Sequence, residues 1–129
     1  MRTLTLLATV LAIHATCFCA DTEVSELSAE EAHRLIEGEE DVIVLDVRTP
    51  KEFAEGHLAG AHNIDFLADT FSSEVEKLDP EKTYLIHCRS GSRSGKSLAV
   101  FRELKFKKIY HLTSGYLGWV EAGNPVATE

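Results

Sequence analysis

Short apolar stretches recur along the chain, and the intervals between them leave room for helices. Continuous apolar stretches of this length are typical of parallel strands, because such strands are buried on both faces of a sheet. The stretches that we expect to form strands are residues 42–45, 61–64, 83–87 and 109–112.

Helix signals fall between these stretches. Ser28 and Glu31 have the spacing of a capping box, and apolar positions follow until Gly38. Thr49 and Glu52 form a second capping box around a proline at the first helical position, so a short helix is expected to end at Gly56. Further helices are expected at residues 67–78, 92–104 and 114–121.

Alternating strands and helices predict an α/β domain with a mostly parallel central sheet flanked by helices on both faces. The length of 129 residues suits one domain, and the composition, 44% hydrophobic and 26% charged, is that of an ordinary globular protein. We therefore expect one core and one site.

The first twenty residues differ from the rest of the chain. Arg2 precedes an apolar run over residues 4–13, and small or polar residues follow up to Ala20. This layout predicts a secretory signal peptide at residues 1–20 and a folded domain at residues 21–129. Cleavage after Cys17 or Cys19 fits about as well, and a lipoprotein signal at Cys17 fits less well. The alternative is an uncleaved anchor, although the run is shorter than the roughly 20 apolar residues that cross a bilayer.

The formal net charge of −8 at pH 7 argues against a nucleic-acid or anionic-membrane partner, because no basic stripe is present. Removal of the signal peptide leaves the chain acidic and without a membrane segment. We expect the partners to be small molecules, with a protein as the alternative. Secretion of a small domain without disulfides favours the bacterial periplasm as its location.

Cys88 is the only cysteine outside the predicted signal peptide, so no intramolecular disulfide is expected in the folded domain. An unpaired thiol in an oxidising compartment is a liability unless it is buried or used. A buried and inert cysteine is the alternative interpretation. The residues around Cys88 distinguish a functional thiol from an inert one.

Cys88 follows a predicted strand directly and opens a loop into a predicted helix. Ligands of open α/β sheets bind at such junctions, beyond the carboxyl ends of the strands. The loop, CRSGSRS at residues 88–94, has the composition of one whose backbone N–H groups surround an anion. A helix N-terminus and two nearby arginines favour a thiolate, so we expect an unusually acidic Cys88. A solvated turn with an incidental cysteine is the alternative.

Three segments in order resemble the rhodanese family. Residues 45–64, which begin LDVRTP and end GAHNI, look like its first signature, and residues 88–94 look like its active-site loop. Gly115 and Trp119 resemble its C-terminal motif. The resemblance covers residues 23–126 and implies a single rhodanese-like domain. The family often has a glycine pair where this chain has Ser114 and Gly115. This difference affects only the expected geometry of the local turn.

The resemblance implies a thiosulfate sulfurtransferase that works without a cofactor. The Cys88 thiolate would take the outer sulfur of thiosulfate or a similar donor, hold it as a persulfide, and pass it to a thiophilic acceptor. The acceptor would be cyanide in vitro and a thiol or a protein in vivo. The residues expected to bind substrate are Arg89, Ser90, Gly91, Ser92, Arg93 and Ser94.

The arginines offer forked donors to an oxyanion, and the loop amides can stabilise a persulfide. Arg89 as a solvated surface charge is the alternative to this role. By the family pattern, Asp46 and Arg48 brace the active-site loop, and Asp46 is expected to orient other groups rather than act as a base.

The remaining candidates are assigned structural roles. His57 and His62 lack the spacing of zinc ligands and are expected to satisfy backbone groups, so we expect no metal. His87 is expected to be a packing residue. Trp119 is expected in the core beneath the last helix, with the mouth of the site as the alternative.

Two other functions compete with sulfur transfer. A phosphatase or arsenate reductase of the related type needs an arginine six positions after the cysteine, where this chain has Ser94. Binding modules of this fold usually lack the active cysteine, which is present here. A persulfide carrier that serves a partner protein uses the same Cys88 chemistry and stays open.

Overall fold

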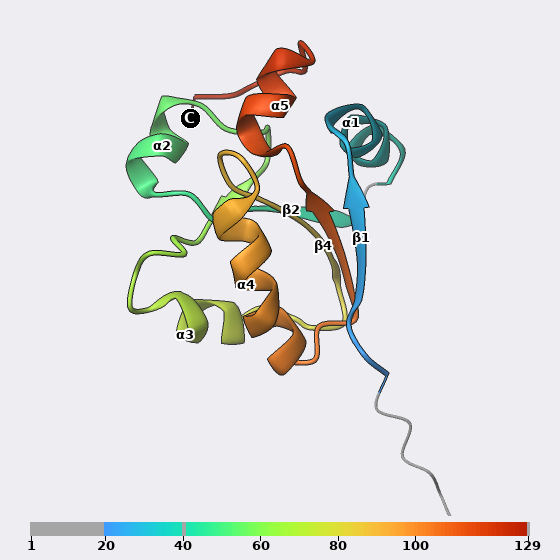
Figure 1. The fold of residues 1–129 in the computed structure, drawn as a ribbon, viewed down its shortest axis with the longest axis vertical. Helices are drawn as coiled ribbons and strands as arrows, with labels where there is room; N and C mark the ends of the chain where they lie inside the picture. The colour runs from blue at the N-terminus through green and yellow to red at the C-terminus, as the bar shows by residue number, and fades with distance from the viewer. Residues whose placement is uncertain (1–19, 40, 129) are drawn as a thin grey trace, which may run out of the picture.

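The computed structural model describes residues 20–39 and 41–128. Its centre is a five-stranded sheet, around which the helices lie (Figure 1). The strand order is β1-β5-β4-β2-β3, and all four pairings are parallel. The strands are β1 (Glu23–Leu27), β2 (Val42–Asp46), β3 (His62–Asn63), β4 (Thr83–His87) and β5 (Lys108–Leu112). The helices are α1 (Ala29–Gly38), α2 (Pro50–Glu55), α3 (Phe71–Glu76), α4 (Ser92–Glu103) and α5 (Gly115–Glu121).

Successive residues of the central strands face opposite sides of the sheet, and each side has its own apolar cluster. Leu45 and Ile86 pack with Phe101 of α4 in the cluster that α3 and α4 cover. Val44 and Leu85 pack with Trp119 of α5 in the cluster that α1 and α5 cover. The predicted α/β domain with helices on both faces is therefore confirmed.

Both predicted capping boxes are present. The Ser28 hydroxyl accepts from the Glu31 N–H while the Glu31 carboxylate accepts from the Ser28 N–H, and Thr49 and Glu52 repeat the arrangement in α2. Gly56 ends α2 as expected. These local bonds satisfy backbone donors that a helix start leaves without partners.

Two elements differ from the prediction. Strand β1 was not predicted, because it is a half-exposed edge strand whose sequence, EVSEL, lacks a continuous apolar run. The helix predicted over residues 67–78 begins only at Phe71. Before it, the Asp65 carboxylate accepts from the Leu67 N–H, and the Asp65 carbonyl accepts from the Ala68 N–H. This local bonding holds residues 65–68 in a turn instead of a helix.

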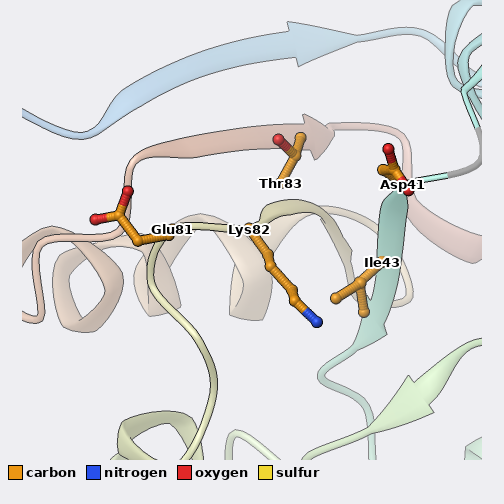
Figure 2. Close-up of a pocket in the computed structure, with 5 residues that line it drawn as sticks. All are labelled: Asp41, Ile43, Glu81, Lys82 and Thr83. Carbon is orange, nitrogen blue, oxygen red and sulfur yellow. The ribbon is translucent and has the colours of Figure 1, made fainter.

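The carboxyl ends of β2 and β4 meet at one edge of the sheet, because the two strands are parallel neighbours with Asp46 opposite His87. The two motifs singled out from the sequence follow these strands and so lie side by side. A pocket lined by Asp41, Ile43 and residues 81–83 lies at the other end of the same strands (Figure 2).

Within the described ranges, no helix combines the length and the apolar character that crossing a membrane requires. The predicted signal peptide falls almost entirely on residues 1–19, which lie outside the described residues.

Candidate active site

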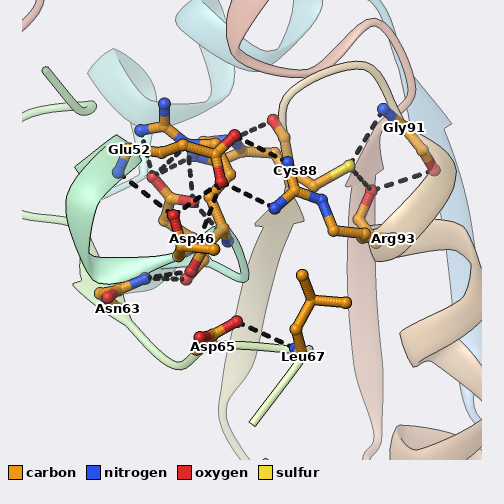
Figure 3. Close-up of polar contacts among 12 residues, drawn as sticks. Asp46, Glu52, Asn63, Asp65, Leu67, Cys88, Gly91 and Arg93 are labelled. Atoms are coloured by element: carbon orange, nitrogen blue, oxygen red, sulfur yellow. Dashed lines mark hydrogen bonds and ion pairs between the residues drawn. The ribbon is translucent and has the colours of Figure 1, made fainter. Parts of the chain in front are cut away.

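The sulfur of Cys88 sits inside the loop that joins β4 to α4. Cys88 is the first residue after β4, and its side chain is buried at 1% exposure. Its Sγ accepts from the Gly91 N–H at 3.1 Å and from the Ser94 hydroxyl at 3.3 Å (Figure 3). Gly91 is the N-cap of the twelve-residue helix α4, and Ser94 lies in its first turn, so the sulfur faces the positive end of that helix.

The environment of Cys88 acts on its pKa in two directions. Burial of the thiol raises the pKa, while hydrogen bonds from the Ser94 hydroxyl and from the backbone at Ser94, Ser90 and Gly91 lower it. The hydrogen bonds outweigh burial, so the pKa lies below its ordinary value. The pKa of Cys88 is therefore shifted in the expected direction, and hydrogen bonds within the loop are the main cause. The charge of Cys88 also raises the pKa of Arg93, so this guanidinium interacts with the sulfur as well.

Two glycines allow other segments to approach this loop closely. Gly91 has φ +97°, and a Cβ there would lie 2.1 Å from the Thr113 carbonyl oxygen. Gly115 has φ +63°, and a Cβ there would lie 2.4 Å from the Arg89 carbonyl oxygen. Ser114, by contrast, has φ −79°, which any residue adopts. The departure from a glycine pair at Ser114 is therefore compatible with the turn.

Helix α5 is attached to the loop through backbone hydrogen bonds. The Tyr116 N–H donates to the Cys88 carbonyl at 2.8 Å, and the Leu117 N–H donates to the Arg89 carbonyl at 3.0 Å. The start of α5 therefore holds the first two residues of the loop in position.

Arg93 is bound to Glu52 of α2. Its two terminal nitrogens donate to the two carboxylate oxygens, each at 2.8 Å, in a forked ion pair. The same carboxylate also accepts from the Thr49 N–H and hydroxyl, so Glu52 caps α2 and ties it to the active-site loop. The sequence identified Glu52 only as a capping residue, because the partner is 41 positions away.

Asp46 and Arg48 form a buried ion pair below the loop. Arg48 Nε and Nη2 donate to the Asp46 carboxylate at 2.6–3.0 Å, and Arg48 Nη2 also donates to the Gly56 carbonyl at 2.7 Å. The guanidinium carbon lies 4.1 Å from the centre of the Tyr116 ring. Asp46 thus orients Arg48, and Arg48 connects the end of α2 with the start of α5.

His87 and Asn63 complete the support of the two loops. His87 is fully buried, and its Nδ1 donates to the Cys88 carbonyl at 2.9 Å. Burial lowers the pKa of His87, although Asp46 opposes this effect. The Asn63 amide donates to the carbonyls of Asp46 and Arg48. These contacts were not assigned from the sequence, because each joins separate segments or a side chain to the backbone.

The other expected substrate-binding residues lie at the surface of the loop. Ser90, Ser92 and Arg89 are exposed, and Arg89 makes no ion pair with any of the described residues. Arg89 and Arg48 line a pocket beside the loop together with Glu52, Glu55, Tyr116 and Leu117. Ser94 is instead fully buried against the Cys88 sulfur.

His57, His62 and Trp119 lie away from the Cys88 sulfur. His57 Nδ1 bonds the Phe53 carbonyl at 2.8 Å, as expected. His62 is exposed on β3 and bonds no backbone group among the described residues, so the prediction for it was wrong, because its side chain points to solvent at the sheet edge. The described residues contain no cluster of three or more metal-ligating side chains. Trp119 is buried in the core at 2% exposure, and its Nε1 donates to the Pro125 carbonyl.

Arg48→Met is expected to lower the free energy of unfolding by about 3–5 kcal/mol, because it leaves the buried Asp46 carboxylate without its counter-charge. Urea denaturation measures the loss. The double variant Asp46→Leu/Arg48→Met removes both charges and should recover part of the stability. A single variant as stable as the parent would show that the pair does not brace the site.

The ion pair of Glu52 with Arg93 predicts a pH-dependent contribution to stability. The hydrogen bond from Arg93, opposed by burial and aided by Thr49, lowers the pKa of Glu52 from 4.5 to about 2. Because the folded-state pKa is depressed, the contribution is complete above pH 4.5 and is lost as the pH falls toward 2.

Glu52→Gln should therefore lower the free energy of unfolding by up to about 1 kcal/mol near neutral pH, since the pair is partly exposed and screened by solvent. The difference from the parent should shrink below pH 4.5. Urea denaturation across this pH range measures it, with the exposed Glu55→Gln in the same helix as control. A pH-independent difference would contradict the depressed pKa.

The chain was compared with known proteins by sequence and by fold. The family model of the rhodanese-like domain matches residues 28–122. A sulfurtransferase of Allochromatium vinosum is 30% identical over 80% of this chain and 94% of its own length. Thiosulfate sulfurtransferase 18 of Arabidopsis thaliana is 34% identical over 66% of this chain and 71% of its own.

The fold agrees with a solved structure as well. A rhodanese-related protein from Thermoplasma volcanium superposes with a TM-score of 0.70 at 27% identity, over 81% of this chain and 98% of that one. The match over residues 28–122 includes both the first signature and the Cys88 loop. The chain therefore belongs to the rhodanese-like domain family, in which its relatives include sulfurtransferases.

Proposed function

We propose that the protein is a thiosulfate sulfurtransferase that carries sulfur as a persulfide on Cys88. In the first step the Cys88 thiolate attacks the outer sulfur of thiosulfate. A new S–S bond forms to Cys88 as the S–S bond of the donor breaks, and sulfite leaves with the bonding electron pair. The enzyme then holds a negatively charged persulfide.

The second step returns the enzyme to its starting state. A thiophilic acceptor attacks the outer sulfur of the persulfide, and the electron pair of the broken S–S bond returns to Cys88 as a thiolate. Cyanide becomes thiocyanate in this step, whereas a thiol acceptor becomes a persulfide itself. Neither step requires a metal or an organic cofactor.

The observation that carries this proposal is the pair of hydrogen bonds to the Cys88 sulfur. The donors, the Gly91 N–H and the Ser94 hydroxyl, are already in place around a sulfur whose pKa is lowered by them. A thiolate is the nucleophilic form of cysteine, and fixed donors stabilise developing negative charge without reorganisation. The same donors can serve the thiolate that leaves when the acceptor takes the sulfur.

Arg89 is the arginine of the loop best placed to attract an anionic donor. It lines the pocket beside the loop, whereas Arg93 is occupied by Glu52. The exposed hydroxyls of Ser90 and Ser92 offer further donors. The role of Arg93 toward the donor is thus proposed as indirect, through the position of the loop.

We further propose that the domain acts after secretion, in a bacterial periplasm, on a small sulfur donor and a small or protein acceptor. The support for this is the signal-like composition of residues 1–20 and the acidic charge of the chain. The alternative role with the same Cys88 chemistry is that of a persulfide carrier, which delivers its sulfur to a partner protein.

Thiosulfate:cyanide sulfur transfer tests the proposal. Cys88→Ala should lower turnover by at least about a thousandfold, the scale typical of a lost nucleophile. The parent protein incubated with thiosulfate alone should gain one sulfur atom, which peptide-mass mapping should locate on Cys88. Ser72→Ala, which changes an exposed serine in α3, serves as the control.

A protein that gains the sulfur but transfers it slowly to cyanide would identify a carrier that needs a specific acceptor. A protein that never gains sulfur would contradict the proposal and favour a binding role.

Hydrolysis of an aryl phosphate by the parent protein should not exceed that of Cys88→Ala. The residue six positions after Cys88 is Ser94, which is fully buried and bonded to the sulfur, so no arginine from that position can bind a tetrahedral oxyanion. A steady-state assay with a chromogenic aryl phosphate measures this. Robust Cys88-dependent hydrolysis would overturn the assignment to sulfur transfer.

A further inference from the structure

A third side chain extends the hydrogen bonds of the Cys88 sulfur into the sheet. His111 belongs to β5, and its Nε2 lies 2.8 Å from the Ser94 hydroxyl oxygen, which in turn lies 3.3 Å from Cys88 Sγ. All three residues are buried, with exposed fractions of 5% for His111, 0% for Ser94 and 1% for Cys88. The three side chains therefore form a buried chain that crosses from β5 through α4 to the active-site loop.

The Ser94 hydroxyl has one proton and three partners within hydrogen-bond distance. The Gly91 carbonyl oxygen can only accept a hydrogen bond, and the same holds for Cys88 Sγ once the thiol is ionised. The third, His111 Nε2, either donates or accepts, depending on which ring nitrogen carries the proton. If Nε2 accepted, it would compete with the sulfur for the single hydroxyl proton.

The opposite tautomer removes His111 from the competition for the Ser94 proton. With a proton on Nε2, His111 donates to the Ser94 oxygen, and the Ser94 proton is left for the sulfur and the Gly91 carbonyl. The Nδ1 atom of His111 makes no hydrogen bond with any described residue, so a proton placed there would be unused by the protein.

The surroundings of the His111 ring favour a neutral imidazole. Burial lowers the pKa of His111, and Glu26, its register partner on β1, opposes this effect. His87 of the neighbouring strand β4 is also titratable; burial lowers its pKa, and the charge of His111 lowers it further. Gly95 of α4 lies against the ring edge, with His111 Cε1 3.7 Å from where a Cβ would be.

We propose that His111 is a positioning residue of the Cys88 site, which donates from Nε2 to the Ser94 oxygen and thereby directs the Ser94 hydroxyl proton toward the Cys88 sulfur. His111 contacts neither the sulfur nor a substrate and acts through Ser94. This inference rests on the proposed function only in taking Cys88 as the nucleophile.

The ionisation of Cys88 tests the proposal without any sulfur transfer. The pH midpoint of thiolate formation is measured by ultraviolet absorbance, and each variant is compared with the same variant carrying Cys88→Ala, so that the difference reports Cys88 alone. His111→Phe, which keeps a ring but has no donor, should raise the midpoint. At a pH below the midpoint, the fraction of Cys88 present as thiolate should fall about fivefold, the effect of one hydrogen bond.

Three further variants separate positioning from a general structural effect. His111→Gln, whose amide nitrogen can reach the place of Nε2, should restore most of the thiolate. In a Ser94→Ala background, His111→Phe should change the midpoint little, because the residue through which it acts is absent. His62→Gln, at an exposed histidine of β3, should leave the midpoint unchanged.

Long-range nitrogen–proton NMR correlations of the parent protein read the tautomer directly and do not depend on a variant that folds. The His111 signals, assigned through backbone and side-chain correlations of the parent protein, should show the proton on Nε2. A proton on Nδ1, a midpoint lowered by His111→Phe, or an equal shift in the Ser94→Ala background would each overturn the proposal. Absence of sulfur transfer with these ionisation results intact would contradict only the proposed function.

Discussion

The parallel register of β2 and β4 is the constraint on which the active site depends. It sets Asp46 opposite His87, and the Val47 N–H continues the ladder by donating to the His87 carbonyl at 2.9 Å. Both strands therefore end at the same level, and the segments that follow them are held against one another. Since the strands are parallel and the core buries them on both faces, a shift of register would separate Arg48 and Glu52 from the Cys88 loop.

Most of the positive charge near Cys88 is already compensated within the protein. Arg48 is paired with Asp46, and Arg93 is paired with Glu52. The stabilisation of a thiolate therefore depends mainly on uncharged donors, the Gly91 amide and the Ser94 hydroxyl, which lie at hydrogen-bond distance from the sulfur. Buried donors of this kind are effective because the local dielectric is low and they need not reorganise. The ion pairs serve to hold the loop in the geometry that aims these donors.

Strand β5, helix α5 and the turn between them contribute more to the site than their distance in sequence from Cys88 indicates. The turn at Thr113 and Gly115 packs against Gly91 and Arg89, and the Tyr116 N–H binds the Cys88 carbonyl. His111 reaches the Ser94 hydroxyl from inside the sheet. Strand β5 and helix α5 thus support the loop in addition to α2, and Arg48 links the end of α2 to the start of α5.

The local sequence determined the elements whose signals are complete within a few residues. The capping boxes at Ser28 and Thr49, the buried strands β2 and β4, and the strand-to-helix position of Cys88 were predicted and are confirmed. The family motifs added the α/β domain of the rhodanese-like type, which the family model confirms. Strand β1 was missed, because an edge strand that is half exposed carries no continuous apolar run.

Only the tertiary structure decided how the site residues are paired. Arg93 binds Glu52 across 41 positions, and Ser94 meets His111 across 17, so neither contact leaves a pattern within a window of sequence. The source of the low Cys88 pKa depends in the same way on which donors the folded loop aims at the sulfur. Residue types and their order therefore identified the proposed nucleophile, because chemistry resides in single side chains. The fold assigned its partners, because hydrogen bonds and ion pairs depend on distances that only the packing of distant segments sets.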